Sequence, residues 1–139
     1  MTVHKLILVE DSEADARVVR RAVERENLDV DVVHLTSAEQ AENFLYSNGN
    51  SNGAARRLVL LDLNLPGADG FTLLDNLKQN QDTSQLPVIV WSSSDQTTDV
   101  ARAYKSGANC YLVKPMALRE ATSLIANVCR FWFNVATIA

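Results

Sequence analysis

The segment LVLLDLNLPGADG, residues 58–70, carries the pattern that decides the fold of this chain. Its four leading apolar residues run directly into Asp62, and Pro66 and Gly67 mark a turn soon afterwards. A short apolar run bounded by turn residues predicts a buried strand. An isolated carboxylate is costly to bury, so Asp62 must be a cap, a paired structural acid or a reactive group.

Four further apolar runs are also only four or five residues long, and most are rich in β-branched residues, so each predicts a strand. Stretches with apolar residues at helical spacing separate them. Alternating strands and helices predict a parallel sheet with helices on both faces. We therefore expect an α/β fold of the flavodoxin-like, doubly wound (βα)5 type, with strand order 2-1-3-4-5. The five expected strands are residues 5–9, 30–34, 58–61, 87–91 and 110–113.

Length and composition are those of one ordinary domain, residues 1–139, with 47% hydrophobic and 22% charged residues. The net charge of −4 argues against a nucleic-acid partner, which normally requires a basic face. No apolar run reaches the length of a membrane span, and the N-terminal residues lack a signal-peptide pattern. We expect a cytoplasmic protein with no membrane partner. Residues 47–57 form the one loop-like stretch, between the second helix and the third strand.

Acidic residues follow two of the expected strands. Glu10 and Asp11 follow the first strand, and Asp62 follows the third. In this fold, ligands bind beyond the carboxyl ends of the strands where the strand order reverses, which is between these two strands. Carboxylates gathered at one point need a positive counter-charge. A hard divalent cation with oxygen ligands supplies it, so the sequence predicts a Mg²⁺ site.

Complementary groups follow the last two strands. Ser92 ends the fourth strand and Lys114 follows the fifth. Taken singly, each residue has a structural alternative: Asp11 could cap a helix, Asp62 could initiate a turn, and Lys114 could be a solvated lysine. Together, acids for a metal, an ammonium group and a hydroxyl suit a phosphoryl group that one carboxylate accepts.

Four segments carry a resemblance to a known family. The chain resembles the receiver domain of bacterial two-component response regulators over essentially its whole length, to about residue 130. A narrower similarity is to the stand-alone regulators that partner cyanobacterial phytochromes. The matching segments are LVEDSEADA (8–16), LVLLDLNLPGADGF (58–71), PVIVWSSSD (87–95) and GANCYLVKP (107–115).

The resemblance implies a role for each acid. Asp62 matches the phosphoacceptor, which receives a phosphoryl group from the phosphohistidine of a sensor histidine kinase, here of the phytochrome type. Asp11 and Asp62 match carboxylate ligands of Mg²⁺, and Glu10 matches the acid that helps to hold the ion through water. Asn64 matches the position whose main-chain carbonyl binds the metal.

The resemblance also implies a switch. Lys114 matches the lysine that pairs with the phosphoryl group and precedes a cis bond to Pro115. Ser92 matches the hydroxyl that contacts the phosphoryl group, although the run of three serines leaves a slip of one residue open. Tyr111 matches the switch aromatic, which repacks the surface made by the fourth helix, the fifth strand and the fifth helix.

The favoured interpretation is a phosphoacceptor signalling protein and not an enzyme. Two other functions are considered against it. A Mg²⁺-dependent phosphohydrolase with an aspartyl nucleophile would place a second acid two residues after Asp62, where Asn64 stands. A flavodoxin-like cofactor binder would need a hydroxyl- or glycine-rich phosphate loop after the first strand, where EDSEAD stands instead.

The end of the chain predicts an interface. Residues of about 130–139 extend the fifth helix as an apolar segment, and charges stop after Arg130. A contiguous apolar patch usually marks an interface, and the alternative is that the segment folds back on the protein's own core. We expect a homodimer through the surface of the fourth helix, fifth strand and fifth helix, with Leu124, Phe131, Trp132 and Phe133 in the contact. The expected core stripe of this helix is Leu118, Ala121, Ile125, Val128, Trp132 and Val135.

Overall fold

Five parallel strands form the main sheet of the protein. The structure is a computed structural model and describes residues 4–47 and 56–137. The strand order is β2-β1-β3-β6-β7, and every neighbouring pair is parallel. Counted along the main sheet, this is the order 2-1-3-4-5, so the predicted fold is confirmed. The strands are β1 (His4–Val9), β2 (Val30–Leu35), β3 (Arg57–Leu61), β6 (Val88–Ser92) and β7 (Cys110–Val113).

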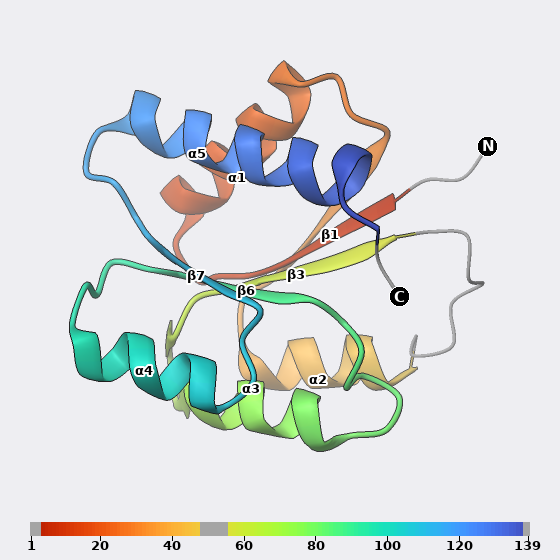
Figure 1. Ribbon diagram of the computed structural model, residues 1–139, viewed down its shortest axis with the longest axis vertical. Coiled ribbons are helices and arrows are strands. Elements are labelled where there is room, and N and C mark those ends of the chain that lie inside the picture. The colour runs from red at the N-terminus through yellow and green to blue at the C-terminus, as the bar shows by residue number, and fades with distance from the viewer. Residues whose placement is uncertain (1–3, 48–55, 138–139) are drawn as a thin grey trace.

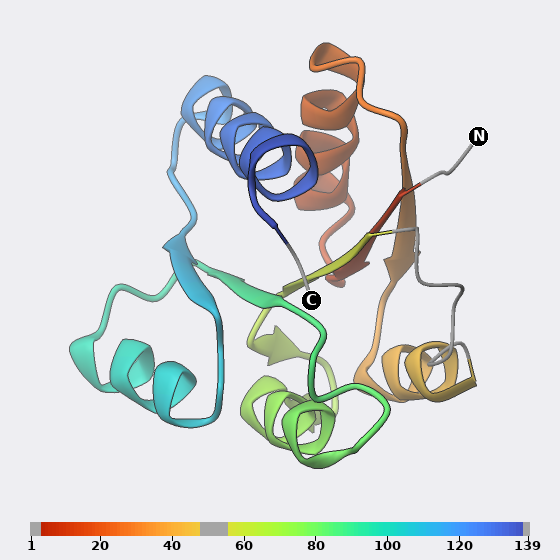
Figure 2. The ribbon, with the colours of Figure 1, turned by 45° about the vertical axis from the view of Figure 1, so that its right-hand side comes forward.

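Helices cover both faces of the sheet, as Figures 1 and 2 show. On one face, α1 and α5 lie side by side, and on the other lie α2, α3 and α4. Among the described residues, no helix combines the length and the apolar character needed to cross a bilayer. The helices are α1 (Glu13–Arg25), α2 (Ala38–Ser47), α3 (Gly70–Gln79), α4 (Thr97–Lys105) and α5 (Leu118–Arg130).

The alternation of side chains along the central strands builds two separate cores. In β3, Leu58 and Leu60 pack under α1 and α5, while Val59 and Leu61 pack against α2 and α3. β1 and β6 follow the same rule, because successive side chains of a strand point to opposite faces. Burial on both faces explains why these strands appear in the sequence as continuous apolar runs.

A small hairpin follows β3 that the sequence did not predict. The two-residue strands β4 (Asn64–Leu65) and β5 (Ala68–Asp69) pair in antiparallel fashion around the predicted turn. Gly67 has a φ of +67°, which a side chain would disfavour. A Cβ atom on Gly70 would lie 2.5 Å from the Leu63 Cα atom, so only glycine lets α3 begin this close to the chain leaving β3.

The C-terminal extension partly folds onto the protein itself. After α5 the chain forms a π-helical turn, η1 (Phe131–Val135), in which Phe133 is only 3% exposed and stacks on the His4 ring at 5.7 Å. The Nη1 atom of Arg56 donates hydrogen bonds of 2.7–3.1 Å to the main-chain oxygens of Trp132, Phe133 and Ala136. The expectation that Phe133 lies on an exposed interface is therefore wrong, because this side chain fills the core beneath α5.

The predicted core stripe of α5 is also partly wrong. Ala121 and Ile125 are buried as expected, but Leu118 is 57% and Val135 66% exposed. Val128, Trp132 and Leu124 are partly buried against the core. Residues 138–139 and most of the predicted loop at 47–57 lie outside the described residues.

We expect Phe133→Ala to lower the free energy of unfolding by about 3–4 kcal/mol, because it removes a buried aromatic side chain. Phe131→Ala is the matched control, since Phe131 is 53% exposed, and we expect it to cost less than about 1 kcal/mol. Urea denaturation followed by circular dichroism measures both. Equal losses for the two variants would contradict the burial of Phe133.

Candidate functional site

The register of the central strands brings Glu10 and Asp62 together. Val9 of β1 pairs with Leu61 of β3, so the residues that follow them stand side by side at the carboxyl edge. The Asp62 amide donates to the Val9 oxygen at 2.9 Å, which continues the pairing to the acid itself. Both carboxylates are buried: Glu10 is 0% and Asp62 is 5% exposed. The structure therefore places the two predicted acids in one crevice.

Lys114 enters the same crevice from β7. Its amide donates to the Ser92 oxygen at 2.7 Å, which fixes the residue at the end of the β6–β7 pair. Its Nζ atom lies 2.7 Å from Glu10 Oε1, 2.8 Å from Asp15 Oδ2 and 3.4 Å from Asp62 Oδ2. One ammonium group thus forms ion pairs with three carboxylates, two that follow strands β1 and β3 and one from the first turn of α1.

Burial and mutual charge shift the proton affinities of these groups. Burial, and next the neighbouring Asp62 carboxylate, raise the pKa of Glu10 to about 8, and Lys114 opposes this shift. Burial alone would lower the pKa of Lys114, but its bonds to Asp15 and Glu10 and the charge of Asp62 raise it to about 12. The crevice is therefore short of positive charge, and a cation would relieve this shortage.

A divalent cation fits the three predicted acids. Glu10, Asp11 and Asp62 each offer one oxygen atom, and these atoms lie within 4.8 Å of one another. Oxygen ligands at about 2.1 Å from an octahedral ion lie about 3–4 Å apart, so small side-chain movements would complete a site. Asp11 is exposed, which keeps the site accessible. The Asn64 amide donates to Asp62 Oδ1 at 3.1 Å, which places Asn64 beside the site.

The predicted hydroxyl and aromatic residues are connected through Ser94. Ser92 is fully buried at the end of β6, and its Oγ atom accepts a hydrogen bond from the Ser94 amide at 3.1 Å. The Tyr111 hydroxyl donates to the Ser94 oxygen at 2.8 Å. The Ser94 hydroxyl donates to Asp99 Oδ2 in α4 at 2.6 Å. The residue that ends β6 is thereby linked to both β7 and α4.

One expectation about the backbone is wrong. The bond between Lys114 and Pro115 is not cis, since the described residues contain no cis peptide bond. The trans form is the lower in free energy even before proline, by roughly 0.5–1 kcal/mol.

Two residues at the site escaped the sequence argument. Asp15 binds Lys114, and its signal is the Ser12-x-x-Asp15 pattern: Ser12 caps α1 by accepting from the Asp15 amide, which sets Asp15 in the first turn. His34 lies beside Glu10, and its Nε2 atom is 2.6 Å from the Glu10 main-chain oxygen. A carbonyl only accepts, so the ring donates. No sequence signal marks His34, since the contact depends on how β1 and β2 pair.

Comparison with known proteins settles the family. The model of the response regulator receiver domain family matches residues 6–126, which span the main sheet and most of α5. The chain belongs to this family. The receiver is 35% identical over 134 residues to the response regulator Rcp1 of Synechocystis sp., with 96% of this chain and 91% of Rcp1 covered.

Solved structures agree with this assignment. The receiver superimposes on the Mn²⁺-bound form of Rcp1 with a TM-score of 0.86 at 33% identity, covering 98% of this chain and 99% of Rcp1. It superimposes on the phosphorylated cyanobacterial phytochrome response regulator RcpA with a TM-score of 0.89 at 31% identity, covering 99% of each chain. This chain is therefore a two-component receiver domain related to phytochrome response regulators, and its acidic crevice is of the kind in which receiver domains bind a divalent metal.

We expect Lys114→Met to lower the free energy of unfolding by about 3 kcal/mol in EDTA, because it leaves buried carboxylates without their counter-charge. Adding Mg²⁺ should narrow the difference from the wild type, since a bound cation replaces the lost charge. Guanidinium denaturation with and without Mg²⁺ measures both effects.

Lys105→Met, which alters an exposed lysine of α4, is the control and should change stability by less than about 0.5 kcal/mol. A loss in Lys114→Met that Mg²⁺ leaves unchanged would contradict the charge argument.

Proposed function

We propose that Asp62 is the phosphoacceptor of this receiver domain and that Mg²⁺ is the metal of its acidic crevice. The observation that carries the proposal is the convergence of Glu10, Asp11, Asp62 and Lys114 on one point at the carboxyl edge. Asp62 is the acid that both β3 and Lys114 hold in place. Asp11, Asp62 and the Asn64 oxygen would bind the ion directly, and Glu10 would hold it through water.

In the proposed phosphoryl transfer, Asp62 and Lys114 have different roles. An oxygen of the Asp62 carboxylate bonds to the phosphorus of the kinase's phosphohistidine, while the phosphorus–nitrogen bond breaks and its electron pair returns to the imidazole. Lys114, which lies 3.4 Å from Asp62 Oδ2, pairs with the oxygens of the incoming group. A bound metal would supply further positive charge beside the same oxygens. Only this transfer and the later hydrolysis of the aspartyl phosphate, which releases inorganic phosphate and restores the Asp62 carboxylate, are catalysed, so the protein is not a general phosphohydrolase.

Phosphorylation would act on the rest of the protein through Ser92. A phosphoryl group on Asp62 adds charge and acceptor oxygens, to which the Ser92 hydroxyl can donate. Movement of β6 toward the phosphoryl group would pull on Ser94, whose oxygen holds the Tyr111 hydroxyl at 2.8 Å. Tyr111 would then turn inward and repack the surface made by α4, β7 and α5. This is a local charge event that a packed surface converts into altered protein contacts.

The donor that we propose is a phytochrome-type sensor histidine kinase in the cytoplasm. Support comes from the similarity to the phytochrome response regulator RcpA along 99% of both chains. The acidic balance of the sequence, −4, fits a partner that is a protein rather than a nucleic acid.

We expect incubation with acetyl phosphate and Mg²⁺ to add one phosphoryl group to the wild type, which intact-mass spectrometry detects. Asp62→Asn should show no adduct, because the amide is not a nucleophile, and EDTA should abolish the reaction of the wild type. Asp69→Asn, in the exposed β5, is the matched control and should be modified normally. An adduct of equal yield on Asp62→Asn would overturn the assignment.

We expect Ser92→Ala to accept the phosphoryl group but to lose the conformational response, because the contact from β6 is missing. The measurement is the change in the amide resonances of Tyr104 and Tyr111 on phosphorylation. Ser93→Ala is the control, since Ser93 is exposed beside the buried Ser92, and it should respond like the wild type. A full response in Ser92→Ala would refute the coupling.

We also propose a homodimer through the surface of α4, β7 and α5, with Phe131 as its main apolar contact. Phe131 and Val135 are the most exposed apolar side chains of η1, at 53% and 66%. Leu124 and Trp132 are partly buried against the core, and the exposed parts of their side chains would join the dimer contact. Phe133 is excluded because it is buried.

Sedimentation velocity tests the dimer with and without phosphorylation. We expect Phe131→Ser to weaken self-association by about tenfold, since interface aromatics often carry more than 1 kcal/mol. Met116→Ser is the control, because Met116 is an exposed apolar residue that lies before α5. A monomeric profile of the wild type in both states would rule the dimer out.

A further inference from the structure

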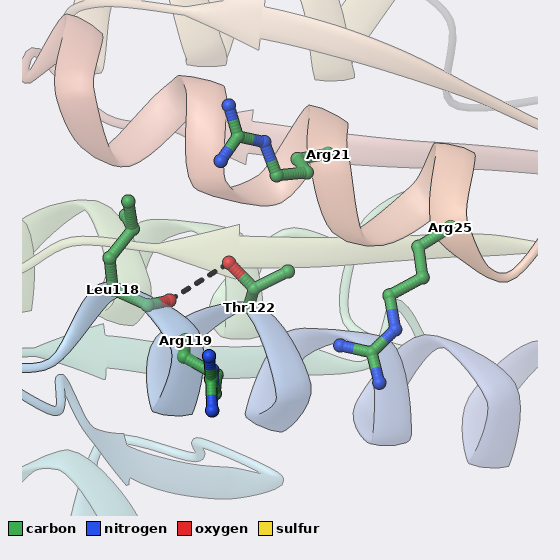
Figure 3. Close-up of a pocket in the computed structure, with 5 residues that line it drawn as sticks. All are labelled: Arg21, Arg25, Leu118, Arg119 and Thr122. Carbon is green, nitrogen blue, oxygen red and sulfur yellow. Dashed lines mark hydrogen bonds between the residues drawn. The ribbon is translucent and has the colours of Figure 1, made fainter.

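A second charged site lies between α1 and α5, away from the acidic crevice. A pocket of about 270 Å³ lies there, and Figure 3 shows that its lining residues come from both helices. No carboxylate lines it, although the chain as a whole carries a net charge of −4. An adjoining pocket of about 200 Å³ adds Arg17 and Val18. The residues that line the larger pocket are Arg21, Arg25, Leu118, Arg119 and Thr122.

Two arginines of this pocket differ from several other arginines of the protein in having no carboxylate partner. Arg20, Arg102 and Arg130 each pair with a carboxylate, at 3.7, 3.4 and 3.3 Å. Within the part of the chain that the structure describes, Arg21 and Arg119 form no ion pair or side-chain hydrogen bond. The positive charge around the pocket is therefore not neutralised by its neighbours.

The spacing of the arginines along α1 adds to this uncompensated positive charge. Arg17, Arg21 and Arg25 recur every four residues, so their charges lie above one another on the helix face beside α5. Like charges at this spacing destabilise a helix, and a purely structural surface does not need them. Arg25 reaches across to α5, where its Nη1 atom donates to the neutral Ser123 Oγ at 3.3 Å. A ligand with several negative charges would offset the repulsion.

We propose that this pocket binds a small molecule that carries two or more phosphate groups. Guanidinium groups bind phosphate through paired hydrogen bonds, and three of them line this pocket. A volume of about 270 Å³ accommodates a diphosphate. Leu118, which is 57% exposed at the edge of the pocket, offers an apolar wall to an attached organic group. Inorganic pyrophosphate and a nucleoside triphosphate share this chemistry.

The pocket is independent of the proposed phosphoryl site at Asp62. That crevice is lined by carboxylates and repels an anion unless a metal is bound. The pocket needs no metal, because its own side chains supply the positive charge. Binding in the presence of EDTA therefore separates the two sites.

Titration of isotope-labelled full-length protein with pyrophosphate and, separately, with ATP tests the proposal by NMR in EDTA. Sulfate at matched ionic strength is the reference. We expect saturable shifts at Arg21, Arg119 and Thr122 that weaken as salt rises, since the site is exposed. Binding of both probes means that the phosphates suffice, and binding of ATP alone means that the nucleoside contributes; either result supports the pocket.

Variants of matched charge make the test specific. Arg21→Gln and Arg119→Gln should each weaken binding about tenfold, as expected for loss of a hydrogen bond to a charged group. Arg20→Gln makes the same change on the same helix outside the pocket and should have no effect, and neither should Asp62→Asn. Equal weakening by Arg20→Gln, or shifts that do not saturate, would overturn the proposal. So would binding of an acidic helical peptide without binding of either probe.

Discussion

The ion pairs of Lys114 are the interaction on which the site depends. The parallel register sets Glu10 beside Asp62 at the edge of the sheet, and α1 adds Asp15 from above. Such a cluster of buried and half-buried acids would be unstable alone. Lys114 makes it tolerable, because its Nζ atom lies within 3.4 Å of all three carboxylates. The same surplus of negative charge makes the crevice fit for a divalent cation, so the charge that strains the fold is also the charge on which the proposed phosphoryl transfer would depend.

The main sheet was predictable because its strands are buried on both faces. Burial on both faces leaves a continuous apolar run, and each of the five runs became a strand within one or two residues of its expected bounds. The acids were predictable for a related reason, since a charge at the end of such a run is costly to bury unless it is paired or binds a metal. The β4–β5 hairpin was missed because strands of two residues have no periodicity. His34 and Asp15 were missed because their partners come from elsewhere in the chain, which a pattern along the sequence does not reveal.

The end of α5 shows where the argument from periodicity fails. Apolar residues occupy most sides of this helix, so the phase of its buried stripe is not fixed by hydropathy. The stripe that we expected runs from Leu118 to Val135, but both of these ends are exposed. The buried residues are Ala121, Thr122, Ile125, Ala126, Cys129 and Phe133, so the stripe keeps Ala121 and Ile125 and is otherwise shifted by about one residue. Contacts from β1 and from Arg56 to η1 choose this phase, and they join segments about eighty or more residues apart.

Helix α1 contributes to both charged regions of the molecule. Its first turn lies at the acidic crevice, and its later turns line the cationic pocket. Its first turn carries Glu13 and Asp15, where negative charge favours the positive end of a helix, and its last turn carries Arg25, where positive charge favours the negative end. The helix dipole thus accounts for both ends but not for Arg17 and Arg21, which lie in the interior. Their position beside α5 is explained if the face that they form meets an anion. One helix would then provide a carboxylate that holds Lys114 at the proposed phosphoryl site and, further along, a cationic face for a second ligand.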